Sequence, residues 1–140
     1  MKNNIMKKLL SILFICLTLC ACSKSVDAKS LVGAYQDCVS KRASATIDII
    51  ENDKLSIDIT WSSSAQEEDK WLIVAEVNNN KITYDDITHL INNYDNFGNV
   101  NSTKLDDYKS GYFEIKENKL YWTGSNNEQT SKCVFEKVVD

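Results

Sequence analysis

Apolar residues recur at every second position through most of this chain, and that period decides what it can fold into. The clearest run is at 55–61, where leucine, isoleucine and tryptophan alternate with serine, aspartate and threonine. Successive side chains of an extended strand point to opposite faces, so such a run predicts a strand with one buried face. Similar runs lie at 45–49, 71–77, 113–115, 120–122 and 133–139. The pattern therefore predicts an all-β protein built from antiparallel strands.

Short segments rich in Asn, Asp and Gly separate the predicted strands, and these residues favour tight turns. They lie at 51–54, 78–81, 95–99 and 117–119. Short strands joined by tight turns predict an up-and-down meander of about eight strands. In a chain of 140 residues without proline, we expect a small lipocalin-like barrel rather than a sandwich. A closed barrel has no exposed strand edges, and proline is one of the residues that otherwise protect such edges from pairing.

The first 22 residues have the pattern of an export signal. A lysine-rich start precedes an uncharged run at 9–21, which is shorter than the roughly 20 apolar residues of a spanning helix. The run ends in Leu19-Cys20-Ala21-Cys22, which resembles the lipobox of bacterial lipoprotein signal peptides. That resemblance implies cleavage before Cys22 and a diacylglyceryl group on its thiol. Cys20 is the weaker candidate, because bulky Leu19 would then occupy the small-residue position.

The chain therefore divides into a signal peptide (1–21), a lipidated N-terminus with a polar tether (22–30) and a barrel domain (31–140). Two or more acyl chains give stable anchoring, so we expect a lipoprotein on the outer face of a membrane. Without the signal peptide, 13 basic residues remain against 20 acidic ones, a net charge of −7. An acidic domain of this kind is not expected to bind nucleic acid.

Two cysteines remain once the signal peptide and the lipidated residue are set aside. Cys38 and Cys133 lie in the first and last predicted strands, which become neighbours when a barrel closes. Exported proteins can keep disulfides, so we expect a bond here that holds the closing seam. Two buried free thiols are the alternative.

The segment 61–71 is the most unusual stretch, because two tryptophans enclose a run of hydroxyls and three consecutive acids. Indoles offer rigid contact area and hydroxyls offer adaptable hydrogen bonds. Arg42, the only arginine, is a further candidate because its guanidinium suits a two-pronged contact with a carboxylate. The predicted binding residues are Arg42, Trp61, Ser63, Ser64 and Trp71. The alternative, that both tryptophans pack inward, stays open.

No pattern typical of catalysis or metal binding stands out. The serines lack a Gly-x-Ser-x-Gly elbow, and the single histidine, His89, lies on a strand-like segment. The histidine and the two cysteines of the barrel domain have no zinc spacing, and 95–99 lacks the ligand spacing of a calcium loop. We therefore expect no enzyme, no metal and no cofactor.

Several short motifs resemble those of small lipoproteins common in anaerobic gut bacteria, a family with no assigned activity. They are Gly33-x-Tyr35-x-Asp37, Ser40-x-Arg42-Ala43, Trp61-x-Ser63-Ser64-Ala65, Trp71, Gly111-x-Phe113-x-Ile115, Leu120-x-Trp122 and Cys133-x-Phe135-x-Lys137. The resemblance implies the same location and an all-β fold, and it adds no mechanism.

A second resemblance is to the lipoprotein inhibitors of c-type lysozyme, which are lipid-anchored small barrels that present a serine-containing loop to the enzyme's cleft. Cys38, Cys133 and Ser62-Ser63-Ser64-Ala65 carry it. The inhibitor loop continues with glycine and tyrosine, where this chain has Gln66 and Glu67. We expect an extracytoplasmic binding module for a small molecule, a peptide or a protein, with a lysozyme-inhibitor-like interaction protein as the alternative.

Overall fold

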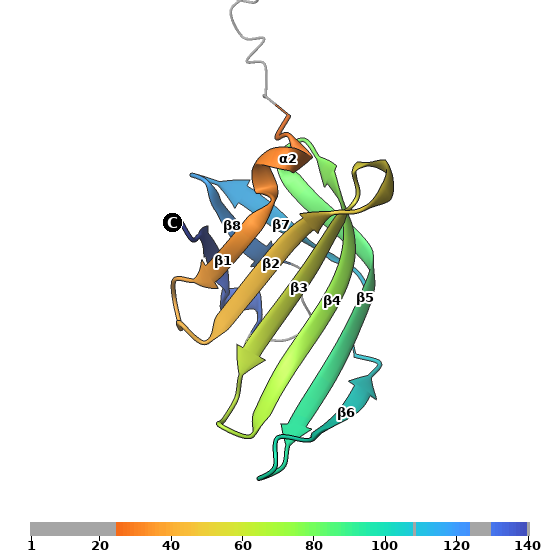
Figure 1. The fold of residues 1–140 in the computed structure, drawn as a ribbon. Helices are drawn as coiled ribbons and strands as arrows, with labels where there is room; N and C mark the ends of the chain where they lie inside the picture. Colours follow the sequence, from red (N-terminus) through yellow and green to blue (C-terminus); the bar gives the residue numbers. More distant parts are fainter. Residues whose placement is uncertain (1–24, 108, 124–129, 140) are drawn as a thin grey trace, which may run out of the picture.

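A computed structural model describes residues 25–107, 109–123 and 130–139 (Figure 1). The predicted signal peptide and Cys22 lie outside the described residues. One short helix, α2 (Ala28–Leu31), and the 3-10 turns Glu51–Asp53 and Thr130–Lys132 accompany nine strands. The strands are β1 (Gly33–Asp37), β2 (Ala43–Ile49), β3 (Leu55–Ser62), β4 (Glu67–Asn78), β5 (Lys81–Tyr94), β6 (Val100–Leu105), β7 (Gly111–Lys116), β8 (Lys119–Thr123) and β9 (Val134–Lys137). Within the described residues, no helix is long and apolar enough to cross a membrane.

Eight of these strands close into an antiparallel barrel, as the sequence predicts. The order around the barrel is β4-β3-β2-β1-β9-β8-β7-β5, and the pairing of β4 with β5 completes the circle. The first and last strands are neighbours, with Tyr35 opposite Lys137 and Asp37 opposite Phe135. β6 is the additional strand, and it pairs with the second half of β5.

Side chains from the inner faces fill the barrel and form its core. In β3, the alternating residues Leu55, Ile57, Ile59 and Trp61 are all buried, while the polar residues between them are partly exposed. The same alternation runs through β2. Burial of these apolar side chains, at about 25 cal/mol for each Å² removed from water, is the main stabilising contribution.

A chain of aromatic rings crosses the interior. The Trp122 ring stacks on Phe113 at 5.4 Å and meets the edge of Trp71 at 5.4 Å. Phe113 in turn packs on Tyr84 at 5.9 Å, and the Tyr84 hydroxyl accepts a hydrogen bond of 2.7 Å from the indole nitrogen of Trp122. The rings thereby connect β4, β5, β7 and β8, which are consecutive strands around the barrel.

A β-bulge in β5 changes which of its residues face inward. Ala75 pairs with Tyr84 and Val74 pairs with Asp86, so Asp85 is an extra residue on β5. One extra residue reverses the alternation beyond it. As a result Tyr84 and His89, an even and an odd position, are both buried inside the barrel.

We expect a Gly111→Ala substitution to destabilise the barrel by about 2 kcal/mol, because overpacking of a filled interior typically costs about 1–3 kcal/mol. Gly111 lies opposite Tyr84, and a methyl group there would come within 2.7 Å of the Cζ atom of that ring. The ring cannot retreat without losing its hydrogen bond to Trp122. Urea denaturation measures the change. Ser110→Ala, at the exposed neighbouring position, is the control that should leave stability unaltered.

Candidate functional site

Two hairpins extend past the rest of the barrel, at the end opposite α2 (Figure 1). They are the β3–β4 hairpin and the β5–β6 hairpin, and residues 62–70 and 89–107 of the two are called the hairpin end below. The hairpins are joined at their tips, where the Tyr94 amide donates to the Gln66 carbonyl at 2.8 Å. The Gln66 side-chain amide also donates to Asn96 Oδ1 at 3.0 Å. The two tips therefore form one connected unit.

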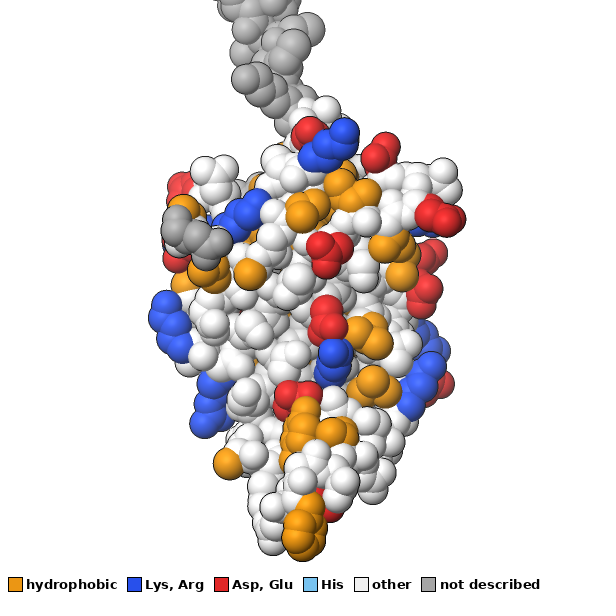
Figure 2. Space-filling view, in the orientation of Figure 1, with side chains coloured by type: hydrophobic (Ala, Val, Ile, Leu, Met, Phe, Trp, Pro, Cys, Tyr) orange, Lys and Arg blue, Asp and Glu red, His pale blue; other side chains and the backbone are white. Residues whose placement is uncertain are grey.

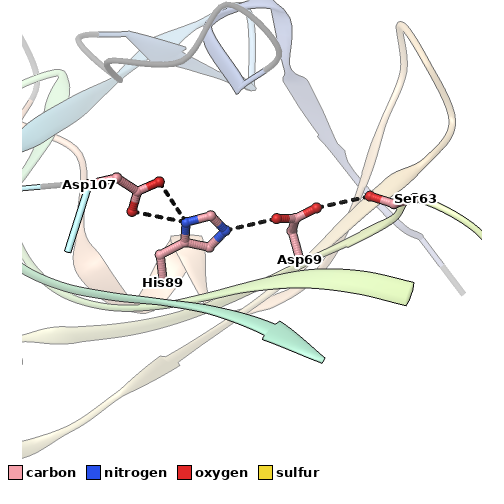
Figure 3. Close-up of polar contacts among 4 residues, drawn as sticks. All are labelled: Ser63, Asp69, His89 and Asp107. Atoms are coloured by element: carbon pink, nitrogen blue, oxygen red, sulfur yellow. Dashed lines mark hydrogen bonds and ion pairs between the residues drawn. The ribbon is translucent and has the colours of Figure 1, made fainter. Parts of the chain in front are cut away.

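A chain of four polar side chains lies on the inner side of this end (Figure 3). Ser63 Oγ donates to Asp69 Oδ2 at 2.9 Å, and Asp69 Oδ1 lies 2.9 Å from His89 Nε2. On the other side of the ring, His89 Nδ1 lies 2.9 and 3.0 Å from the two carboxylate oxygens of Asp107. The chain thus connects β4, β5 and the segment that follows β6.

Both nitrogens of His89 face carboxylates, which accept hydrogen bonds when ionised and cannot donate. The ring is 4% exposed, against 20% for the Asp69 side chain and 43% for the Asp107 side chain. It also stacks on Trp71 with a centroid distance of 4.7 Å and an interplanar angle of 11°. The ring is therefore held between two carboxylates and the face of an indole ring, which fixes its position at the hairpin end.

A second polar group lies on the outer face of the same strands. Glu68 Oε1 accepts hydrogen bonds from Asn92 Nδ2 at 2.9 Å and from the Tyr94 hydroxyl at 2.6 Å. Ser102 of β6 donates to Asn92 Oδ1 at 2.6 Å. The hydrogen bond to Glu68 is the main cause that raises the pKa of Tyr94 above its ordinary value. These contacts fasten β6 to β5 and β4.

The structure distributes the five predicted binding residues over different environments. Trp61 and Trp71 are core residues, 7% and 2% exposed, and both lie within strands rather than in a loop. The connection between β3 and β4 is correspondingly short, from residue 63 to 66. Arg42 is exposed, and no carboxylate among the described residues lies within ion-pair distance of it.

The two serines differ in what their hydroxyls contact. Ser63 belongs to the inner polar chain through Asp69. Ser64 is exposed at the tip, and its Oγ accepts a hydrogen bond of 3.2 Å from the Gln66 amide. Of the predicted residues, only Ser63 therefore belongs to the polar cluster that the fold assembles.

A small cavity of about 270 Å³ lies beside the seam between β1 and β9. It is lined by Asp37, Val39, Ser40, Trp61, Lys132 and Cys133. Among the described residues, the buried indole nitrogen of Trp61 has no hydrogen-bond partner. The Asp37 carboxylate accepts from the amides of Ser40 at 2.8 Å and Val134 at 3.0 Å. Burial acts to raise the pKa of Asp37, but the hydrogen bond from the Ser40 hydroxyl, followed by those from the backbone amides, outweighs it and holds that pKa below its usual value.

The predicted disulfide between Cys38 and Cys133 is wrong, because the structure holds the two residues as separate thiols. Asp37 and Phe135 are opposite each other and both are buried. Alternation along the strands then turns Cys133 into the core and Cys38 to the outer face. The two residues lie close together because β1 and β9 are neighbours, but their side chains point to opposite faces of the sheet.

We expect both thiols to be alkylated in denaturant without any reductant, because no disulfide protects them. In the native protein only Cys38 should react readily. Burial, helped by the charge of Asp37, raises the pKa of Cys133 to about 12, so little of its reactive thiolate forms near neutral pH. Peptide mass spectrometry after iodoacetamide treatment locates the modified residues. A peptide pair linked through Cys38 and Cys133 would contradict the structure.

Sequence reasoning missed the cluster around His89. Asp69 and Asp107 are 20 and 18 positions away from His89, and no local spacing indicates that they meet. The one usable signal was the histidine itself, a single titratable ring on a strand with apolar residues around it. Within the part of the chain that the structure describes, no three His, Cys, Asp or Glu side chains are arranged to hold a metal ion.

No family model matches this chain, and neither the curated proteins nor the solved structures contain a match. The resemblances to gut lipoproteins and to lysozyme inhibitors therefore stay predictions. What the site can do has to be argued from its own geometry.

Proposed function

We propose that this protein is a non-catalytic binding module, held at the outer face of a membrane by a lipid on Cys22, and that it presents its hairpin end to a partner. The arrangement around His89 carries this proposal. A general base needs a nitrogen lone pair directed at the group that it deprotonates. Here Asp69 and Asp107 face both ring nitrogens at 2.9 Å, so the ring serves to hold the hairpin end together.

Ser63 supports the same conclusion. An activated serine nucleophile donates its proton to an adjacent base, which a third group orients. Ser63 instead donates to Asp69, and the carboxylate stands between the hydroxyl and the imidazole (Figure 3). The order of groups is serine, aspartate, histidine, aspartate, in which the histidine does not contact the serine. This order suits a structural hydrogen-bond chain.

The position of the hairpin end suits a binding role. The described chain begins at Ser25, three residues before α2, and the two hairpins are at the end of the barrel opposite α2 (Figure 1). Cys22 is three residues before Ser25. A lipid on Cys22 would therefore leave the hairpin end directed away from the membrane. Because aromatic rings cross the interior, a partner would contact the outside of this end.

Site-specific photo-crosslinking in the cells that make the protein tests this proposal. A benzophenone amino acid is placed at Ser64, which is exposed at the hairpin end, and in a matched variant at Lys29, which is exposed at the α2 end. We expect discrete adducts with a second macromolecule from position 64 and not from position 29. Equal adducts from both positions, or none from position 64, would count against a binding function for the hairpin end.

Lipid anchoring has its own test. We expect a Cys22→Ala variant to lose membrane association and to keep residues 1–21, while Cys20→Ala behaves like the parent protein. Fractionation and intact-mass measurement report both properties. If Cys22→Ala stays in the membrane fraction at its normal mass, the anchor is elsewhere.

The lysozyme-inhibitor alternative is decided by an activity assay. The purified chain is added at micromolar concentration to a c-type lysozyme acting on bacterial cell walls. Inhibition that disappears on Ser64→Trp would favour that alternative. The orientation of Ser63 toward Asp69 leads us to expect no inhibition.

A further inference from the structure

We propose that the outer edge of β6, together with Phe97, is a docking site for an extended peptide segment of a partner protein, which adds to the sheet as a further strand. This inference rests on the proposed binding function and names the surface and the kind of partner. The argument begins with the position of β6. Within the described residues it pairs with β5 alone and is the one strand outside the closed barrel.

The pairing with β5 determines which main-chain groups of β6 point outward. The Tyr94 amide donates to the Gln66 carbonyl of the β3–β4 tip at 2.8 Å, so the main-chain groups of Tyr94 face away from β6. The Asp95 amide, one position on, faces the other way and donates to the Asn99 carbonyl at 3.0 Å. Hydrogen-bonded and non-hydrogen-bonded pairs alternate along an antiparallel ladder. The amides of Val100, Ser102 and Lys104 are therefore directed to the outer edge. An edge of this kind is a template for another strand.

β6 lacks the features that usually protect an exposed edge. Such edges are blunted by proline, by a bulge or by several charged side chains. β6 has the sequence VNSTKL, and its one charge is Lys104. No register shift interrupts its pairing with β5, and five of its six residues are exposed. The strand thus offers a regular and nearly uncharged edge.

Phe97 supplies an anchor beside this edge. It is 90% exposed at the turn between β5 and β6, and Val100, at the start of β6, is 51% exposed. Figure 2 shows hydrophobic surface at this lower tip of the molecule. Aromatic residues, phenylalanine among them, are enriched at protein interfaces.

The turn that carries Phe97 is pre-organised. The Asp95 carboxylate accepts from the amides of Phe97 and Asn99, both at 2.8 Å, and from the Asn99 side chain at 2.7 Å. Hydrogen bonds from Asn99 are the main cause that lowers the pKa of Asp95, so the carboxylate stays ionised and keeps the turn intact over the physiological range. A fixed turn reduces the entropy that Phe97 would lose on binding.

The chemistry of an open edge selects the occupant. Outward main-chain amides and carbonyls are satisfied by the main chain of an extended segment, whereas a lipid interior would leave them without partners. A second copy of the chain is a poorer fit. A six-residue strand is about 20 Å long and covers well under the roughly 800 Å² per partner that stable complexes bury. An extended peptide segment can pair with the main-chain edge of β6 and can also place an apolar residue against Phe97.

Peptide display tests the proposal with the full chain in detergent micelles. A library of random dodecapeptides is selected on the wild-type protein, and the recovered peptides are measured by fluorescence anisotropy. The decisive variant is Lys104→Pro, which removes one outward amide and leaves the ladder to β5 intact, because proline is tolerated at such edge positions. Lys104→Ala is its matched control, because it removes the same charge and keeps the amide.

We expect Lys104→Pro to weaken binding by about tenfold or more and Lys104→Ala to leave it within about twofold. Phe97→Ser should also weaken it by about tenfold, while Asp95 still holds the turn through the backbone. Equal affinities for Lys104→Pro and Lys104→Ala would overturn the edge-pairing proposal, as would a failure to recover any binding peptide. A concentration-dependent dimer that Lys104→Pro abolishes would overturn it in favour of a second copy.

These outcomes are separable from the test of the proposed function. Adducts from position 64 together with no effect of Lys104→Pro would leave the binding module in place and remove β6 as its docking edge. No adducts from position 64 together with peptide binding at β6 would keep the edge and call the cellular role into question. Circular dichroism of each variant confirms that the barrel is folded before binding is measured.

Discussion

A Trp71→Ala variant should lose about 4 kcal/mol of unfolding free energy, since truncation of a buried tryptophan typically costs about 3–5 kcal/mol. Trp71 is 2% exposed, stacks on His89 and meets the edge of Trp122. Its removal would leave a void at the point where the aromatic rings and the inner polar chain meet. Guanidinium denaturation followed by far-ultraviolet circular dichroism measures the loss.

The neighbouring position provides the control for this prediction. Leu72 points to the outer face and is 41% exposed, so Leu72→Ala should cost less than about 1 kcal/mol. A small loss for Trp71→Ala, comparable to that of Leu72→Ala, would mean that the indole is not part of the core. A folded Trp71→Ala protein would then reopen the hypothesis that Trp61 and Trp71 contact a ligand.

Replacing His89 with leucine should destabilise the protein by about 3 kcal/mol. Removing the partner of a buried carboxylate typically costs about 3–5 kcal/mol, because the carboxylate is left without its hydrogen bond. We expect a cost at the lower end of this range, because Asp107 is 43% exposed and water can solvate it. Asp69 is 20% exposed and would be the more costly of the two unpaired carboxylates. The same denaturation experiment measures the effect.

A second substitution separates lost charge pairing from lost packing. Adding Asp69→Asn to His89→Leu removes the unpaired carboxylate, so the double variant should recover about 1 kcal/mol relative to His89→Leu. Asp107→Asn alone should cost less than about 1 kcal/mol, because an exposed partner contributes little. If His89→Leu has no effect, or if the double variant is less stable than His89→Leu alone, the ion pairs do not hold the hairpin end.

The sequence predicted the strands well where burial is one-sided. In β3, every second residue from Leu55 to Trp61 is buried, as the alternation indicated. The closed barrel with β1 beside β9 followed from the number of strands and the short turns. β6 has no such alternation, because five of its six residues are exposed, and the sequence therefore gave no sign of a strand outside the barrel.

The candidate site was less accessible to prediction. The alternation in β3 placed Trp61 on the apolar face, but β4 is apolar on both faces around Trp71, so its pattern does not say which face is buried. The burial of His89 was also difficult to predict, because the bulge at Asp85 reverses the alternation in β5 and places both Tyr84 and His89 inside the barrel. The disulfide failed for the same reason. Cys38 directly follows β1 and Cys133 directly precedes the neighbouring β9, but their side chains point to opposite sides of the sheet.

By itself, the sequence determined that this chain forms antiparallel strands, where several of the turns between them lie, and that the strands are numerous enough to close. These properties are local, because strand formation depends on side chains two positions apart and turns depend on a few adjacent residues. Only the tertiary structure decided that His89 meets Asp69 and Asp107, and that β6 keeps an open edge next to Phe97. Those contacts join residues far apart in the chain, and their register is set by the packing of the whole barrel.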